Sequence, residues 1–375
     1  MKVLVTGAGG FVGRNLCAVL RRREDVELYE YDLGNTEAEL NLFLQNADII
    51  FHLAGVNRPK DPGEYKTGNA GFTEEICQKL KKFGRAARVA MSSSIQARLD
   101  NPYGISKRDA EEALKLYAEG TGAECVIFRF KNLFGKWCRP NYNSVTATFC
   151  HNIAHGLPIQ ISNPANVVEL TYIDDVVDAF CRLLNSSPAP GFRYAQPLAS
   201  HKITLGELAD AVRSFAGHRE TLMLPDYNSR FMQALYATYL SYMEDEEYGY
   251  KLNIKSDNRG SLAEFIKSPH FGQIFVSRTK PGITRGNHFH QTKTEKFMIV
   301  QGEGIIRLRH IESHNVIEYP ARGCEYRVVD IPPGYTHSIE NVGEGEMVTL
   351  FWSDEVFDPS HTDTWFEPVI RSQSR

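Results

Sequence analysis

A glycine-rich run near the start of the chain constrains the fold most strongly. Lys2–Thr6 is a short apolar segment, Gly7-Ala-Gly-Gly-Phe-Val-Gly13 follows it, and a helical pattern continues to about Arg23. Val26–Tyr31 has the composition of a second strand and is followed by Asp32. The order of strand, glycine turn, helix, strand and acid is typical of a dinucleotide site. The sequence therefore predicts the first half of a parallel α/β sheet.

The residues of this run have separate expected roles. Gly7 permits a tight turn, Gly10 lets the backbone approach a pyrophosphate, and Gly13 lets the helix lie close to the strand. Asp32 is placed to bind ribose hydroxyls, which favours NAD, whereas Arg14 could meet the 2′-phosphate of NADP. These residues by themselves leave NAD and NADP as alternatives.

Strands and helices continue to alternate after this run. We expect strands at Ile49–Leu53, Arg88–Met91 and Cys125–Phe130, and helices from Asn69 to about Phe83 and over Tyr103–Ala118. This alternation predicts a doubly wound parallel sheet, on which ligands bind beyond the carboxyl ends of the strands. The glycine turn, a serine run and a tyrosine all map to that edge.

The tyrosine belongs to a candidate hydride-transfer site. Tyr103 and Lys107 lie four positions apart on a predicted helix, so both project from one face. We expect the lysine ammonium to lower the pKa of the Tyr103 phenol, which could then donate a proton to a carbonyl near neutral pH. The serine run Ser92-Ser-Ser94 ends the strand before this helix.

The first part of the chain resembles the extended short-chain dehydrogenase/reductase family over about residues 1–240. The motifs are Thr6 to Gly13, His52-Leu-Ala-Gly55, Ser92 to Ser94, Tyr103-x-x-x-Lys107, Arg129 to Gly135 and Thr171 to Asp175. The resemblance implies that Ser94 binds the substrate carbonyl, Tyr103 donates the proton, and Lys107 holds the nicotinamide ribose and tunes Tyr103. Ser94 precedes Tyr103 by a short gap, which leaves Ser93 as an alternative.

The same resemblance implies two sets of binding residues. Asn132 and Arg139 fall where the family receives the nucleotide half of a nucleotide-sugar, and an arginine fork suits phosphate. A solvated loop is the alternative reading there. The residues expected to bind the dinucleotide are Gly7, Gly10, Phe11, Val12, Gly13, Arg14, Asp32, Leu53, Ala54, Tyr103 and Lys107.

The character of the chain changes at the acidic stretch Glu244-Asp-Glu-Glu247, which we interpret as an exposed linker. We accordingly expect a reductase domain at residues 1–245 and a second domain at residues 246–375. Short strands separated by turn residues predict a β-sandwich or small barrel there. The expected strands are Gln273–Arg278, Lys296–Gln301, Gly304–His310, Tyr326–Ile331 and Met347–Trp352.

Four residues of the second domain form a candidate metal site. His288 and His290 are two positions apart on a strand and so face the same way, and Glu295 could return across a hairpin. His337 supplies a third imidazole. This mixed set of nitrogen and oxygen ligands suits zinc, nickel, iron or manganese. The alternative is that these histidines are surface or packing residues and bind no metal.

The region from Gly282 to Glu295, with Pro332 to Asn341, resembles the cupin family of jelly-roll barrels, which implies one divalent metal, with zinc the expected ion. The pair Asp257 to Gly260 and Arg285-Gly-Asn-His288 resembles the sugar-nucleotide 3,5-epimerase cupins. In those enzymes the histidine after Arg-Gly is the catalytic base, so His288 is either a ligand or the base. Arg285 is then expected to bind substrate.

The two modules together resemble the bifunctional enzymes of capsular polysaccharide synthesis. This implies that the barrel epimerises C3 of a UDP-2-acetamido-2,6-dideoxy-4-keto-hexose. The first domain would then reduce C4 with NADPH to UDP-2-acetamido-2,6-dideoxy-L-talose, in the UDP-L-FucNAc pathway, as a homodimer. The alternatives are a single-activity reductase or 4-epimerase with a structural barrel, and a dinucleotide-sensing regulator.

Composition limits the remaining function classes. A net charge of −4 and a pI near 6.3 do not indicate the excess of basic residues that is typical of nucleic-acid-binding proteins. The seven cysteines are scattered without a CxxC pair, so we expect reduced thiols and a cytoplasmic location. Apolar stretches such as Ile49–Leu53 are too short for membrane insertion, and no signal peptide is expected.

Overall fold

The computed structural model describes residues 1–61, 63–244 and 248–371. The chain forms two compact units, Met1–Ser214 with Ala234–Met243, and Phe215–Gln233 with Glu244–Arg375. Most of the predicted acidic linker lies outside the described residues, as does the predicted boundary after residue 245. The division into residues 1–245 and 246–375 therefore stays a prediction.

The first unit contains a six-stranded parallel sheet in the order β2-β1-β3-β4-β5-β8. Every strand pair in it is parallel, which requires a crossover helix between consecutive strands. The strands are β1 (Lys2–Thr6), β2 (Glu27–Tyr31), β3 (Ile49–His52), β4 (Arg88–Ser94), β5 (Glu124–Phe130) and β8 (Gly191–Tyr194).

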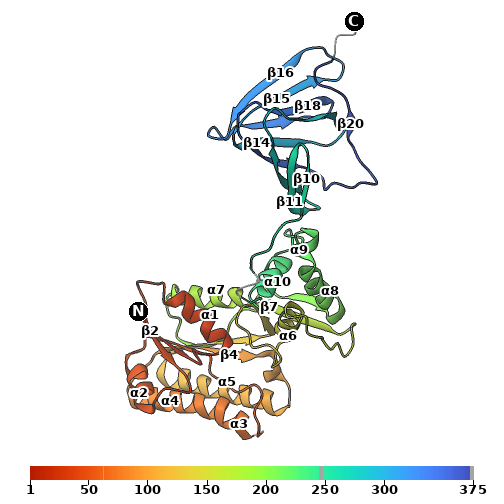
Figure 1. The fold of residues 1–375 in the computed structure, drawn as a ribbon. Coiled ribbons are helices and arrows are strands. Elements are labelled where there is room, and N and C mark those ends of the chain that lie inside the picture. Colours follow the sequence, from red (N-terminus) through yellow and green to blue (C-terminus); the bar gives the residue numbers. More distant parts are fainter. Residues whose placement is uncertain (62, 245–247, 372–375) are drawn as a thin grey trace. The chain divides into compact units, whose positions relative to one another are not determined.

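Helices cover both faces of this sheet (Figure 1). One face packs against α1 (Phe11–Leu20) and α7 (Ile173–Leu184). The other face packs against α2 (Glu37–Asn46), α4 (Phe72–Lys82) and α5 (Pro102–Thr121). Two apolar cores result, and strands buried on both sides consist of nearly continuous apolar residues. The predicted doubly wound parallel sheet is confirmed.

The connection after β3 differs from the prediction of one helix over residues 69–83. The chain forms α3 (Gly63–Tyr65), a π-helix at Lys66–Gly71, and only then α4. Inside the π-helix, the Asn69 side chain bonds outward to Val56 and Ser106. Such widened turns often occur at functional sites.

Smaller elements complete the first unit and lead out of it. A 3₁₀ turn at Ile95–Arg98 links β4 to α5. A three-stranded sheet has the order β6-β7-β9. Its strands are β6 (Asn132–Phe134), β7 (Val167–Tyr172) and β9 (His201–Thr204). The helices of this region are α6 (Val145–Ala154), α8 (Leu205–Ala216), α9 (His218–Thr221) and α10 (Arg230–Leu240).

The second unit contains two antiparallel sheets. One has the order β10-β11-β12-β19-β14-β17 and the other β16-β15-β18-β13-β20. The strands are β10 (Ile254–Asp257), β11 (Gly260–Ser268), β12 (Gly272–Thr279), β13 (Thr284–Phe289), β14 (Glu295–Gln301), β15 (Glu303–His310), β16 (Val316–Arg322), β17 (Val328–Ile331), β18 (Tyr335–Asn341), β19 (Met347–Ser353) and β20 (Trp365–Phe366).

Apolar side chains from both sheets form a single core, including Ile299 of β14, Ile306 of β15 and Ile339 of β18. This confirms the predicted all-β fold for the part of the second unit that contains β10 to β20, whereas its segment Phe215–Gln233 contains the short helix α9. Among the described residues, no helix is long and apolar enough to cross a bilayer.

Candidate functional site

A cleft of about 1200 Å³ lies at the carboxyl edge of the parallel sheet. It is built where β1, β3, β4 and β5 end, which is where ligands bind in open α/β sheets. The residues predicted to bind cofactor or substrate that line it are Gly7, Gly10, Phe11, Val12, Gly13, Arg14, Leu53, Ser94, Tyr103, Lys107, Asn132 and Arg139.

The glycine turn leaves no room for side chains at two positions. Gly7 has φ +71°, and a Cβ there would lie 2.6 Å from the Ala54 amide nitrogen. A Cβ on Gly13 would lie 2.1 Å from the Gly7 carbonyl oxygen. The Asp32 carboxylate accepts a hydrogen bond of 2.6 Å from the Gly9 amide. Asp32 and Ala54 thus lie beside the turn and are not among the residues of the cleft wall.

Three predicted residues meet on the floor of the cleft. Asn101 caps α5 by accepting a hydrogen bond of 2.7 Å from the Gly104 amide, and this places Tyr103 in the first turn. The Ser94 hydroxyl lies close enough to the Tyr103 phenol to lower its pKa. The Lys107 ammonium is buried and donates to the Ser92 carbonyl oxygen over 3.3 Å.

The expectation that Lys107 lowers the pKa of Tyr103 is wrong. Burial raises the pKa of the Tyr103 phenol, the Ser94 hydroxyl partly offsets this, and Tyr65 raises it further. Burial also lowers the pKa of Lys107 to about 8, against a partial opposing effect of the Glu111 carboxylate. The ammonium lies 5.9 Å from the centre of the Tyr103 ring.

Ser93, the alternative to Ser94, points elsewhere. Its hydroxyl donates to the buried carboxylate of Glu111, one turn beyond Lys107 on α5. Arg129 of β5 also binds Glu111, with its Nε 2.9 Å from Oε1. Of the two serines, Ser94 is therefore the one whose hydroxyl meets Tyr103.

Sequence reasoning missed several residues around this centre. A Cβ on Gly55 would lie 2.8 Å from Asn69 Oδ1 and 2.9 Å from Lys107 Nζ, so the bare glycine lets these groups approach. The Tyr65 ring lies 5.7 Å from the Tyr103 ring. Neither Asn69 nor Tyr65 stands in a short motif that marks it, because both reach the site through the irregular turn after β3.

Aromatic rings and arginines line the part of the cleft expected to hold the nucleotide. The Arg139 guanidinium lies 5.1 Å and that of Arg58 5.7 Å from the centre of the Tyr142 ring. Arg14 lies 5.4 Å from the Trp137 ring in the same way. Such stacked guanidinium groups keep their donors free for phosphate. Arg139 is therefore an ordered wall residue, although its role stays a prediction.

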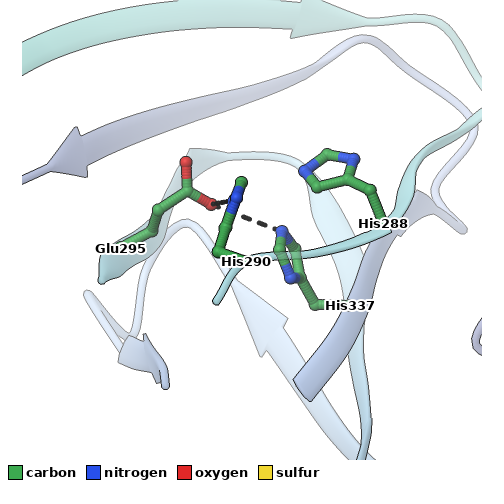
Figure 2. A group of neighbouring side chains, drawn as sticks. All are labelled: His288, His290, Glu295 and His337. Atoms are coloured by element: carbon green, nitrogen blue, oxygen red, sulfur yellow. Dashed lines mark ion pairs between the residues drawn. The ribbon is translucent and has the colours of Figure 1, made fainter. Parts of the chain in front are cut away.

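The second unit brings the four predicted metal-binding residues together (Figure 2). His288, His290, Glu295 and His337 each offer one ligand atom, and these atoms lie within 4.8 Å of one another. Glu295 Oε2 is 3.3 Å from Nε2 of His290 and 3.3 Å from Nε2 of His337. The four side chains form a group that could hold one cation.

The donor atoms at the centre of this group fit a metal. Oε2 of Glu295 and the Nε2 atoms of His290 and His337 are buried, and none has a hydrogen-bond partner in the described residues. Buried polar atoms without partners are rare and costly. Two imidazole nitrogens and a carboxylate oxygen are ligands that zinc and similar divalent ions prefer.

The predicted hairpin between the histidines and Glu295 is wrong. His288 lies on β13 and pairs directly with His337 on β18, whereas Glu295 begins β14 in the opposite sheet. The segment between them crosses from one sheet to the other, and Glu295 thus faces the histidines across the interior.

His288 is only partly buried, whereas the other two histidines, His290 and His337, are fully buried. Burial lowers its pKa to about 4, and His337 and His290 add to this effect, so its ring is neutral at pH 7. A neutral imidazole can serve either as ligand or as base. On the same strand, Arg285 donates from Nε to Thr279 Oγ1 over 3.1 Å. Burial lowers the pKa of the Arg285 guanidinium, and Arg259 adds to this effect.

Two family models match the chain. Residues 3–193 match the NAD dependent epimerase/dehydratase family, and residues 255–365 match the polysaccharide biosynthesis C-terminal domain. The UDP-2-acetamido-2,6-beta-L-arabino-hexul-4-ose reductase of Pseudomonas aeruginosa is 42% identical over 365 residues, covering 97% of this chain and 98% of the relative. UDP-glucuronate 4-epimerase 2 of Arabidopsis thaliana is 29% identical over 47% of this chain and 52% of its own length.

Solved structures agree with these relationships. The capsular polysaccharide assembling protein CapF from Staphylococcus aureus superimposes with a TM-score of 0.91 and 44% identity, covering 98% of this chain and all (100%) of that chain. The UDP-glucuronic acid 4-epimerase of Bacillus cereus, in complex with NAD, has a TM-score of 0.55 and 17% identity over 64% of this chain and 98% of that chain. The second likeness concerns the fold alone.

Proposed function

The chain belongs to the NAD dependent epimerase/dehydratase family, and from this we propose that it is a bifunctional nucleotide-sugar enzyme of capsular polysaccharide synthesis. Its second unit epimerises C3 of a UDP-2-acetamido-2,6-dideoxy-4-keto-hexose. Its first unit then reduces C4 with NADPH to UDP-2-acetamido-2,6-dideoxy-L-talose. The observation that carries the proposal is that Ser94, Tyr103 and Lys107 line the same cleft as the glycine turn.

The reduction step assigns a role to each residue on that floor. NADPH, when bound, supplies the hydride that C4 receives. The Ser94 hydroxyl holds the ketone oxygen, and the Tyr103 phenol delivers the proton to it, because a raised pKa keeps the phenol protonated at neutral pH. Lys107 carries positive charge beneath this pair. The relative from Pseudomonas aeruginosa is itself named a reductase of a hexul-4-ose, which supports a 4-keto substrate.

The epimerisation step falls to the second unit. A divalent metal held by His290, Glu295 and His337, with zinc as the expected ion, would stabilise negative charge on the C4 ketone oxygen. A base must then remove the proton from C3, next to the ketone. His288 is the candidate, since its neutral ring lies beside the other three residues. Arg285, on the same strand, is the residue that we assign to substrate binding, because a guanidinium can donate two hydrogen bonds to an anionic group.

One experiment tests both activities on the full-length protein. We would incubate it with UDP-2-acetamido-2,6-dideoxy-4-keto-hexose in heavy water, with and without NADPH. Deuterium is expected at C3 without NADPH, and a C4-reduced, C3-deuterated product is expected with it. NADH in place of NADPH, at the same concentration, tests the choice of dinucleotide.

The alternatives give different products in the same experiment. Reduction without deuterium at C3 would indicate a single-activity reductase whose second unit is structural. Inversion at C4 of the corresponding 4-hydroxy sugar nucleotide, supplied in place of the ketone and without net consumption of NADPH, would indicate a 4-epimerase. Dinucleotide binding without any turnover would favour a regulator and would contradict the proposal.

A further inference from the structure

The end of the chain lies against the metal-binding strand. Residues 363–369, which we call the C-terminal strap, contain β20, and β20 pairs with β13 so that Phe366 lies opposite His288. The Glu367 amide donates to the Asn287 carbonyl oxygen over 2.9 Å. The Val369 amide donates to Asn287 Oδ1 over 3.1 Å. The strap therefore runs alongside β13 and contacts the residues before and after His288.

Asp363 makes two kinds of contact with the segment that carries His290. Its carboxylate accepts hydrogen bonds of 2.8–3.0 Å from the amides of Gln291, Thr292 and Lys293, and one of 3.0 Å from the Thr292 hydroxyl. Its backbone carbonyl oxygen accepts from Nδ1 of His290. One residue thus holds both the ring and the loop that follows it.

The second contact determines which nitrogen of His290 faces the metal site. A carbonyl oxygen can only accept, so Nδ1 carries a hydrogen, and the lone pair of the neutral ring is then on Nε2. That Nε2 is the atom 3.3 Å from Glu295 Oε2. Groups that hold the second nitrogen of a metal-binding histidine fix its tautomer and its direction.

The other end of the strap is anchored to the strand that carries His337. The Thr336 hydroxyl donates to the Glu367 carbonyl oxygen. The buried Arg309 donates from Nε to the Val369 carbonyl oxygen over 2.9 Å and also pairs with the Glu367 carboxylate at 2.7 Å. The strap therefore connects the segments of two histidines that are far apart along the chain.

Hydrogen bonds, more than apolar burial, hold the middle of the strap. Trp365 is 55% and Phe366 79% exposed. Loss of a few hydrogen bonds should therefore release this part of the strap without opening the core of the unit.

We propose that the C-terminal strap is a positioning element of the metal centre, in which Asp363 orients His290 toward the cation. This inference rests on the proposed metal site. Replacement of Asp363 keeps the main-chain carbonyl oxygen that accepts from His290, but it removes the carboxylate that holds this carbonyl in place behind the ring. Metal binding should therefore weaken by about 10- to 100-fold, the usual effect of disturbing the partner behind a metal-binding histidine.

The test uses the full-length chain, stripped of metal with a chelator. Zinc affinity is measured by competition with a chromophoric chelator for wild type, Asp363→Ala and Asp363→Asn. The matched control is Asp358→Ala, since among the described residues the Asp358 carboxylate binds within its own turn, to Ser360 and His361. The absorption spectrum of bound cobalt(II) reports the geometry of the site, and circular dichroism of the metal-free forms reports folding.

We expect Asp363→Ala to bind zinc about 10- to 100-fold more weakly with an altered cobalt spectrum, Asp363→Asn to recover part of the affinity, and Asp358→Ala to match wild type. Wild-type affinity in Asp363→Ala, with zinc bound normally by the unmutated chain, would overturn the strap proposal alone. A wild-type chain that binds no metal would overturn both proposals. If Asp363→Ala does not fold, Thr336→Val replaces it, and unchanged affinity in that variant overturns the proposal.

Discussion

The ammonium of Lys107 lies 5.9 Å from the centre of the Tyr103 ring, one turn further along α5. Burial disfavours the charged form of both groups. It therefore raises the pKa of the Tyr103 phenol and lowers the pKa of the Lys107 ammonium to about 8. Within this pair the lysine, and not the tyrosine, is the group that titrates near physiological pH.

The rate of reduction should consequently decline as pH rises through about 8. Below this pH Lys107 is charged, and above it the charge is lost, while Tyr103 stays protonated because its pKa is raised. The measurement is kcat/KM for NADPH oxidation with the 4-keto sugar nucleotide between pH 6 and pH 10. A rate that stays constant to pH 9.5 would show that the charge on Lys107 is not required.

Replacement of Glu111 by glutamine should move this decline to lower pH. The Glu111 carboxylate raises the pKa of Lys107, so its loss lowers that pKa further. Glu112→Gln is the matched control, because the Glu112 side chain is 56% exposed on the same helix. An unchanged pH profile in a folded Glu111→Gln enzyme would remove Glu111 as a positioning residue for Lys107.

Tyr103→Phe should slow reduction of the ketone by about 100-fold or more, the usual contribution of a positioned acid. Exchange of the C3 proton into heavy water should continue, because the metal-binding residues lie in the other unit. Tyr65→Phe is the control, since it keeps the ring beside Tyr103 and loses its hydroxyl, with the bond to the Asn57 carbonyl oxygen and the effect on the pKa of Tyr103. Reduction at the wild-type rate in Tyr103→Phe would exclude Tyr103 as the acid.

The metal prediction concerns stoichiometry. Elemental analysis of the purified protein should find about one divalent metal per chain, and it should fall to background in His290→Ala and Glu295→Gln, which each lose a central donor. His361→Ala, at an exposed histidine in the same unit, should keep the metal. Retention of the metal by both site variants would contradict the ligand assignment.

A stability prediction concerns the glycine turn. Gly13→Ala places a Cβ 2.1 Å from a carbonyl oxygen, and the overpacking should cost roughly 1–3 kcal/mol of unfolding free energy and weaken NADPH binding. Gly34→Ala is the control, because a Cβ at Gly34 meets nothing within 4 Å. Urea unfolding and a dinucleotide titration measure the two effects. Equal stability of both variants would contradict the close packing of α1 on the turn.

Much of the framework could be predicted because its signals are local in the chain. The glycine turn, the alternation of apolar strands with helices, and the four-residue spacing of Tyr103 and Lys107 each lie within one short segment. Parallel strands then bring their carboxyl ends to one edge whatever the details of packing. The parallel sheet and the all-β fold of the C-terminal region followed from this reasoning.

Errors arose where a property depends on the surroundings of a residue. The pKa of Tyr103 follows burial rather than its neighbour in sequence, and the direction of the Ser93 hydroxyl follows from a partner one element away. The π-helix around Asn69 is held by bonds to Val56 and Ser106. These contacts between distant parts of the chain cannot be inferred from a single sequence.

The four candidate metal-binding residues show the same division. The sequence by itself determined which side chains could form the set, because residue type and spacing limit the choice to His288, His290, Glu295 and His337. Only the tertiary structure decided how they meet, with Glu295 on the opposite sheet and Asp363 behind His290. Strand pairing and sheet packing join residues distant along the chain, and these contacts exist only once the backbone has folded.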